Sequence, residues 1–137
     1  MAASDRPPQQ AAVIPIRRAS GGEVQVCLIR RKDSAKWGIP KGYIEQHGSK
    51  QAALNEAGEE AGLRGRVVGE SIGTYTYRKR ILPLKVIVFV MEVLEEEAAW
   101  REMRWRERRW CSLEEAGVLL KQHRVWPLFD RIRAELS

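Results

Sequence analysis

The sequence predicts an α/β domain, built from a mixed β-sheet with helices packed on it. Two observations carry this prediction. Apolar and polar residues alternate over residues 24–28, which is the period of a β-strand with one buried face. Residues 50–61 contain no proline and are followed by Gly62, as expected for a helix that ends on a left-handed residue. The predicted order of elements is β-β-α-β-β-β-α-α.

Composition limits the class of protein. The chain has 137 residues, with 24 Lys and Arg against 18 Asp and Glu and a formal net charge of +6. This length suits one domain that folds without a disulfide or a structural metal. No apolar run reaches the roughly 20 residues of a membrane span. Cys27 and Cys111 lie far apart, so we expect reduced thiols and a cytoplasmic protein. The charge favours anionic partners without choosing among nucleic acid, phosphorylated small molecules and acidic membranes.

The N-terminal half supplies the first strands and a helix. We expect residues 1–10 to form a flexible tail before a single domain over residues 11–137. Residues 11–16 are predicted to form a short strand, and Pro15 would place this strand at a sheet edge or a bulge. Ser49 is the expected N-cap of the helix, because a serine side chain can accept from the first free backbone N–H groups.

The C-terminal half is predicted to contain three strands, over residues 67–77, 81–94 and 109–111. The basic residues 78–80 would form the tip of a hairpin between the first two. Residues 95–109 are dense in charge and tryptophan, and the sequence leaves a loop and a short helix both open. A capping box beginning at Ser112 predicts a helix to about Lys121, and Pro127 suits the first turn of a final helix.

Three glutamates, Glu56, Glu59 and Glu60, form the most informative pattern. Within the predicted helix they share about a 100° arc of one face, because successive residues are rotated by about 100°. Like charges at this spacing destabilise a helix by about 0.2–0.5 kcal/mol. A divalent cation held between carboxylates and substrate phosphates would remove that penalty. The alternative from the residues alone is a solvated acidic face neutralised by nearby arginines.

The residues around these glutamates resemble the signature of the Nudix hydrolases. In that family the helix carries R-E-U-x-E-E-x-G-U, where U is a bulky apolar residue, and residues 56–63 here are E-A-G-E-E-A-G-L. The segment W-G-I-P-K-G at 37–42 is similar to the lead-in W-x-x-P-K-G of many members. Residues 109–116 resemble the closing strand-to-helix segment. The resemblance covers about residues 11–136 and implies an α/β/α sandwich, with a mixed sheet and helices on both faces.

Two positions depart from the family pattern. Asn55 stands where the family has the arginine of its signature. The family's upstream glutamate would fall on His47 when counted back from the helix, or on Gly48 when counted forward from Gly42, because this loop is one residue short. Glu45 is the nearest carboxylate. In the family this arginine and this glutamate help to orient the loop and the catalytic carboxylates. Their joint absence fits either a compensated site or one whose catalysis has been weakened or lost.

The resemblance implies a pyrophosphohydrolase that depends on Mg²⁺ or Mn²⁺. Its implied catalytic and metal-binding residues are Glu56, Glu59 and Glu60, and the implied metal site also includes Gly42. Glu56 or a later loop glutamate would act as the base. Loop acids that are either a further ligand or plain surface charges are Glu95, Glu96, Glu97, Glu102 and Glu107. The residues expected to bind substrate phosphates are Arg17, Arg18, Lys41, Arg78 and Arg80.

The basic hairpin and the closing segment are similar to the diphosphoinositol polyphosphate and diadenosine polyphosphate branch. They imply a polyphosphorylated small molecule as substrate. Two alternatives stay open: a non-catalytic Nudix-fold module that binds a nucleotide or polyphosphate, and an RNA 5′-end pyrophosphohydrolase. Nucleic acid is therefore a possible partner that is not favoured, and no membrane partner is expected. The sequence leaves monomer and homodimer open.

Overall fold

The computed structural model describes residues 6–137, which form six strands and three helices. The strands are β1 (Gln10–Arg18), β2 (Val24–Arg31), β3 (Lys41–Tyr43), β4 (Leu63–Lys79), β5 (Leu82–Glu96) and β6 (Arg106–Ser112). The helices are α1 (Ser49–Ala61), α2 (Leu113–Leu119) and α3 (Trp126–Leu136). In this part of the chain no helix is long and apolar enough to cross a bilayer. The short β3 is the one strand that the sequence did not predict.

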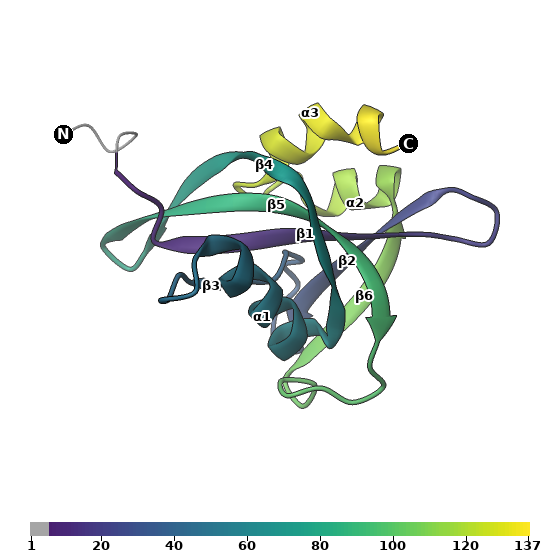
Figure 1. The fold of residues 1–137 in the computed structure, drawn as a ribbon, viewed down its shortest axis with the longest axis horizontal. Coiled ribbons are helices and arrows are strands. Elements are labelled where there is room, and N and C mark those ends of the chain that lie inside the picture. The colour runs from purple at the N-terminus through teal and green to yellow at the C-terminus, as the bar shows by residue number, and fades with distance from the viewer. Residues whose placement is uncertain (1–5) are drawn as a thin grey trace.

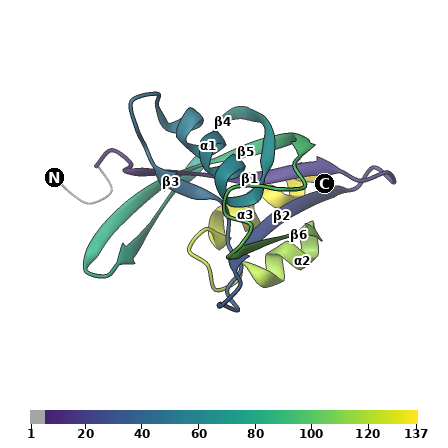
Figure 2. The same cartoon turned by 90° about the horizontal axis from the view of Figure 1, so that it is seen from below.

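The strands form a single mixed sheet in the order β4-β5-β1-β2-β6, and β3 also pairs with β1 (Figure 1). The pairing of β1 with β5 is parallel, and the other pairings are antiparallel. Helix α1 packs on one face of the sheet, while α2 and α3 cover the other (Figures 1 and 2). This arrangement confirms the predicted α/β/α sandwich.

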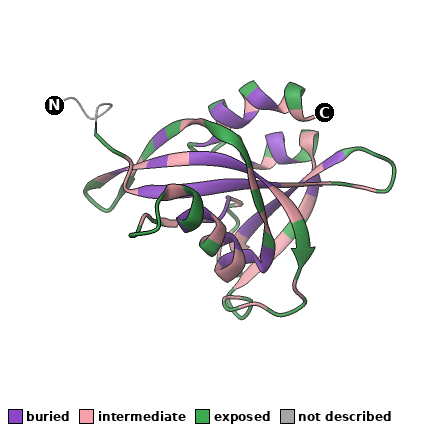
Figure 3. Ribbon diagram, in the orientation of Figure 1, coloured by how far each residue is buried: buried purple, intermediate pink, exposed green. Residues whose placement is uncertain are grey.

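Each face of the sheet has its own apolar core, and the buried residues follow the middle of the sheet (Figure 3). Ala53 of α1 is fully buried, and such small side chains let the helix lie close to the strands. Strand β2 buries both of its faces, with Val26 and Leu28 on the α2–α3 side and Cys27 and Ile29 on the α1 side. The prediction of one buried face was wrong, because helices cover the sheet on both sides.

Pro15 lies in the middle of the sheet, so the prediction of an edge position was wrong. On one side β1 pairs with β3 over residues 10–12 and then with β2 over residues 16–18. Pro15 falls between these two partners. The Val13 N–H donates to the Pro40 carbonyl at 3.1 Å on this side, and backbone N–H groups two residues apart face the same way. The nitrogen of Pro15 therefore faces the change of partner, where no ladder hydrogen bond is lost.

The domain begins slightly earlier than expected. Residues 1–5 of the expected tail lie outside the described residues. Strand β1 starts at Gln10, whose side chain accepts a hydrogen bond from the Tyr77 hydroxyl at 2.7 Å. The N–H of Gln9 donates to the Lys85 carbonyl at 3.0 Å. Both glutamines therefore belong to the folded sheet rather than to the tail.

The ends of α1 are set by glycines. Gly48 occupies the N-cap position with a φ of 89°, and its carbonyl accepts from the Ala52 N–H at 3.0 Å. Ser49 is already the first helical residue, and no side chain caps this end. The prediction of Ser49 as the cap was wrong, because the positive φ that turns the chain into the helix suits glycine. Gly62 ends the helix in the left-handed conformation, as predicted.

The remaining connections follow the sequence closely. The β4–β5 hairpin turns at Arg80, which has a φ of 60°. Residues 97–105 form turns and no helix, which decides between the two predictions for this segment. The capping box is confirmed: Ser112 Oγ accepts from the Glu115 N–H at 3.0 Å, and Glu115 accepts from the Ser112 N–H at 3.0 Å. Pro127 lies in the first turn of α3, as predicted.

Candidate active site

Helix α1 presents its three glutamates to different surroundings. Glu60 faces the sheet and is only 8% exposed. Glu56, one turn earlier, is partly buried against β3. Glu59 is rotated toward the solvent, and 40% of its side chain is exposed. The predicted common face therefore spreads from the protein interior, at Glu60, to the surface at Glu59.

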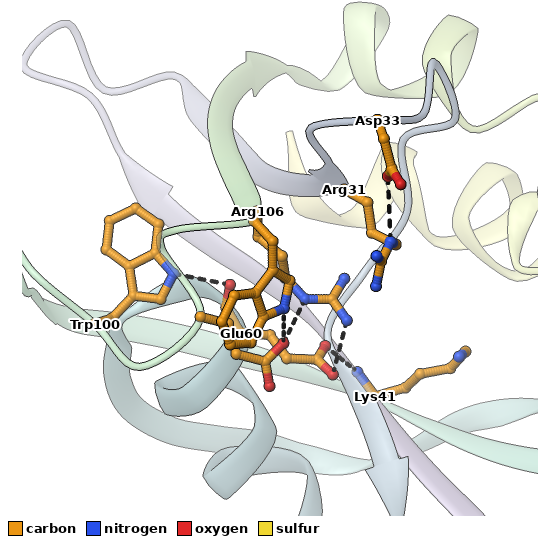
Figure 4. Close-up of polar contacts among 8 residues, drawn as sticks. Arg31, Asp33, Lys41, Glu60, Trp100 and Arg106 are labelled. Carbon is orange, nitrogen blue, oxygen red and sulfur yellow. Dashed lines mark hydrogen bonds and ion pairs between the residues drawn. The ribbon is translucent and has the colours of Figure 1, made fainter.

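The Glu60 carboxylate is held by β3 and β6 (Figure 4). The backbone N–H of Lys41 donates to Glu60 Oε1 at 3.1 Å. Arg106, at the start of β6, lies 3.6 Å from Glu60 Oε2 and donates through Nε to Glu102 at 2.7 Å. One guanidinium thus faces two carboxylates, the buried Glu60 and the partly buried Glu102. Arg31 of β2 lies opposite Arg106 of β6 in the strand register, so a second cation lies at this edge of the site.

Gly42 provides the surface on which Glu56 lies. A Cβ atom at Gly42 would come within 2.2 Å of Glu56 Oε1 and 2.3 Å of its carboxyl carbon. Atoms at such distances overlap, so only a residue without a side chain allows the carboxylate this position. Gly42 was predicted as part of a metal site, and in the structure it makes room for the Glu56 carboxylate.

The neighbouring carboxylates raise one another's proton affinity. Burial raises the pKa of Glu60 from 4.5 to about 8, and the charge of Glu56 acts in the same direction, against Arg106. The pKa of Glu56 is also raised, first by burial and then by the charge of Glu59, while a hydrogen bond with Glu60 lowers it. A buried and a partly buried carboxylate with raised pKa values favour a bound proton or a bound cation.

The donor set suits a hard divalent cation. Carboxylate oxygens are the protein ligands that Mg²⁺ prefers, and the Glu56–Glu60 pair lacks enough nearby positive charge to keep its pKa values normal. Glu59 instead forms an ion pair with Arg101 at 3.0 Å. Within residues 6–137, no three acidic, His or Cys side chains stand in a metal-binding arrangement. Glu59 would therefore have to turn away from Arg101 to complete the set.

Among the five loop acids, Glu102 is the one whose charge acts on the glutamate pair. Its charge raises the pKa of both Glu56 and Glu60. The others have different surroundings. Glu96 pairs with Arg17, Glu97 pairs with Arg64, Glu107 pairs with Arg30, and Glu95 is exposed near the end of β5.

The segment between β5 and β6 also satisfies the free carbonyls at the C-terminus of α1. The Glu102 N–H donates to the Glu59 carbonyl at 3.0 Å, and Trp100 Nε1 donates to the Glu60 carbonyl at 3.0 Å. Arg108 Nη1 donates to the Ala61 carbonyl at 2.7 Å, and its positive charge is favourable at this end of a helix. Sequence reasoning missed Trp100, Arg106 and Arg108, because no local pattern links them to a helix about 40 residues earlier.

Of the five residues expected to bind phosphates, the structure brings Lys41 to the glutamates. Arg17 instead pairs with Glu96 at 2.7 Å and lies 3.9 Å above the Trp110 ring. Lys41 pairs with Ala12 of β1, and Arg17 follows five residues later, about 16 Å along the strand. Arg18 donates to the Gly22 carbonyl in the β1–β2 turn. Neither arginine contacts Glu56, Glu59 or Glu60.

Arg78 and Arg80 lie at the β4–β5 hairpin tip. Arg78 Nη1 donates to the Ile81 carbonyl at 3.2 Å, so it stabilises its own turn. Arg80 is exposed. The hairpin extends away from the body of the molecule (Figure 1). The structure gives neither side chain a contact with the glutamates.

A hollow of about 670 Å³ adjoins Lys41 on the α2–α3 side of the sheet. Its aromatic lining comes from Trp37, Tyr75 and Tyr77, and Lys41 Nζ lies 4.8 Å from the Tyr77 ring centre. The buried Tyr75 hydroxyl has no hydrogen-bond partner. His123 also lines this Lys41 hollow, and burial lowers its pKa to about 4, with the charge of Lys41 acting the same way. At neutral pH its imidazole is uncharged, and because Nδ1 accepts from the Val125 N–H at 2.9 Å, Nε2 carries the proton and can donate a hydrogen bond.

Comparison with known proteins agrees with this geometry. The model of the NUDIX domain family matches residues 7–131. The chain belongs to the NUDIX domain family. This Nudix hydrolase is similar in fold to an Ap4A hydrolase of C. elegans in a binary complex, with a TM-score of 0.78, 20% identity, and coverage of 95% of this chain and 98% of the other. A second C. elegans Ap4A hydrolase structure gives a TM-score of 0.74, at 20% identity and 96% and 100% coverage.

A NUDIX hydrolase from Nitrosomonas europaea is also similar in fold, with a TM-score of 0.67, 18% identity, and coverage of 96% of this Nudix chain and 92% of the other. No curated protein sequence is significantly similar to this chain. The two departures from the Nudix signature are visible in the structure. Asn55 is exposed and accepts from Gln51 Nε2 at 2.8 Å, and Gly48 is the N-cap of α1.

Proposed function

We propose that this Nudix chain is a Mg²⁺- or Mn²⁺-dependent pyrophosphohydrolase that cleaves a phosphoanhydride bond in a dinucleoside polyphosphate. The Glu56–Glu60 pair carries the proposal, with Glu60 buried and Glu56 partly buried. Both carboxylates have raised pKa values in the absence of a cation, and Gly42 leaves room for Glu56 beside Glu60. A purely structural acidic face would leave its carboxylates in solvent, where they cost little.

Glu56, Glu59 and Glu60 are the proposed metal ligands. When bound, the cation neutralises charge on the phosphate oxygens and lowers the pKa of a coordinated water. The chain itself would fix the geometry. The Lys41 N–H and Arg106 orient the Glu60 carboxylate, and Gly42 keeps Glu56 close to it. Arg106 would therefore orient the carboxylates, as the signature arginine does in the family. In this chain Asn55 stands in place of that arginine.

Glu56 is the proposed general base. The other candidate, Glu102, already accepts from Arg106 Nε at 2.7 Å and from Trp105 Nε1 at 3.3 Å. A carboxylate held in this way is less free to take a proton from water. Glu56 is instead partly exposed and lines the hollow of about 130 Å³ at the loop before α1, where a water molecule can reach its carboxylate.

The Lys41 hollow favours a nucleotide over an inositol phosphate. Lys41 connects it to the glutamates, because its backbone binds Glu60 and its side chain lies over Tyr77. The lining is aromatic, and aromatic rings stack on a nucleobase. Three cations, Lys36, Lys41 and Arg124, also line the hollow and suit the phosphates of either ligand, so the aromatic rings carry the choice. The similarity in fold to proteins named Ap4A hydrolases supports the same choice.

The test is turnover with Mg²⁺ and with Mn²⁺ on a panel of substrates. The panel contains diadenosine tetraphosphate, a diphosphoinositol phosphate, ADP-ribose, a nucleoside triphosphate and triphosphorylated RNA. We expect the diadenosine tetraphosphate to be hydrolysed fastest, and product masses identify the bond that is cut. A faster reaction on RNA, with a steep salt dependence, would favour an RNA 5′-end enzyme instead.

Glu59→Gln and Glu92→Gln form a matched pair of variants for this assay. Each glutamate is 40% exposed and pairs with an arginine, at 3.0 Å for Glu59 and 2.9 Å for Glu92. Only Glu59 belongs to the proposed site. We expect Glu59→Gln to lower kcat by about 100-fold or more, and Glu92→Gln to change it by less than about twofold. Metal-dependent binding without turnover would identify a binding module and refute the enzyme.

A further inference from the structure

A second hollow, of about 810 Å³, lies on the outward side of α1. We call it the outer groove. The residues that carry the argument are Gln51, Asn55, Glu59, Arg64, Trp100 and Arg101. One wall comes from α1, and the other comes from the start of β4 and the segment after β5. This segment lies beside the C-terminal end of α1 (Figures 1 and 2).

The outer groove adjoins the candidate active site. A smaller hollow of about 130 Å³ lies at the loop before α1 and is lined by Glu56. Asn55 and Glu59 line both this small hollow and the outer groove. A ligand whose phosphates lie at the glutamates can therefore extend past Glu59 into the groove.

The walls offer an aromatic surface and exchangeable cations. Trp100 is held by its hydrogen bond to the Glu60 carbonyl and by Arg108, which lies 4.1 Å from its ring centre, yet it still lines the groove. Arg64 and Arg101 are 67% and 74% exposed in their ion pairs with acids. Exposed ion pairs of this kind are weak, so both guanidinium groups can turn away from their acids and lie over the face of a bound nucleobase.

Asn55 keeps the junction open. It is exposed, and it lies where the small hollow and the outer groove meet. Its short side chain bonds back along the helix to Gln51 rather than across the junction. An arginine at this position would reach several ångströms further and place a bulky charged group in the passage.

We propose that the outer groove binds the second nucleoside of a two-ended polyphosphate, while the first nucleoside lies in the Lys41 hollow. This inference rests on the proposed function. The two hollows lie near different members of the glutamate set, because Lys41, which lines one hollow, donates its backbone N–H to Glu60, and Glu59 lines the other. The phosphate chain that joins two nucleosides would therefore cross the carboxylates, and a one-ended nucleotide would leave one hollow empty.

Equilibrium binding tests the outer groove without turnover. Diadenosine tetraphosphate and adenosine 5′-tetraphosphate share the same phosphate chain and differ by one nucleoside. We would measure both by calorimetry with Ca²⁺ in place of Mg²⁺. Stacking of one base is worth about tenfold in affinity, so we expect the wild type to prefer the two-ended ligand by about that factor.

Arg64→Gln and Arg66→Gln supply the matched variants. Both arginines lie on β4, both are about 70% exposed, and both pair with a glutamate, but only Arg64 lines the groove. We expect Arg64→Gln to reduce the preference to about threefold or less, and Arg66→Gln to keep it. Asn55→Arg, at an exposed position that tolerates a long side chain, should abolish the preference.

The outcomes separate the two proposals. A wild type without preference, or a preference that survives both Arg64→Gln and Asn55→Arg, would overturn the groove assignment while hydrolysis on the panel still supported the enzyme. A preference lost in Arg64→Gln and kept in Arg66→Gln supports the groove. If that pattern occurs in a protein that hydrolyses nothing, the groove is a binding subsite and the proposed enzymatic function is wrong.

Discussion

Gly42→Ala tests the placement of Glu56 directly. The added Cβ would lie 2.2 Å from Glu56 Oε1, whereas ordinary contact begins at 3.4 Å, so the carboxylate must retreat by about 1.2 Å. A displacement of about 1 Å at a reacting group costs about 100-fold in rate. Stability should change far less, by about 1 kcal/mol, because the overlapping atoms belong to a flexible side chain with a route to solvent.

The assay for this prediction compares kcat with Mg²⁺ and the free energy of unfolding in urea. Gly21→Ala is the control, because its Cβ would also overlap a glutamate oxygen, Glu23 Oε2, at 2.6 Å, in the β1–β2 turn. We expect Gly42→Ala to lose about 100-fold in kcat and Gly21→Ala to retain it. A Gly42→Ala enzyme with nearly full kcat would show that Glu56 needs no fixed position and is not the base.

Three further predictions concern stability. Arg108→Gln removes a charged hydrogen bond from the end of α1 and should cost about 2 kcal/mol in urea unfolding, with the exposed Arg104→Gln as control. Gly58→Ala should stabilise α1 by about 1 kcal/mol, because the nearest atom to its new Cβ is 4.0 Å away. Since the pKa of Glu60 rises from 4.5 to about 8 on folding, the folded metal-free protein holds a proton that the unfolded chain releases. Its free energy of unfolding should therefore decrease as the pH rises from about 4.5 to about 8, and Glu60→Gln should make this decrease smaller.

The sequence by itself determined the features that depend on near neighbours in the chain. The existence of strand β2, the glycine that ends α1 and the capping box at Ser112 were predicted from local patterns, and each is present in the structure. The spacing of Glu56, Glu59 and Glu60 placed three carboxylates on one helix, because helical geometry fixes which residues share a face. Together with the family signature, this was enough for the fold.

Only the tertiary structure decided which side chains meet. Arg17 was expected at the phosphates, but sheet pairing places it beside Glu96. Arg106 pairs with Glu60 although 46 positions separate them in the sequence. Such contacts depend on how strands pair and on where a loop folds back, and local propensities do not encode these choices. The sequence shows which residues are charged but not which of them form ion pairs, because any cation in this basic chain could have neutralised any of its acids.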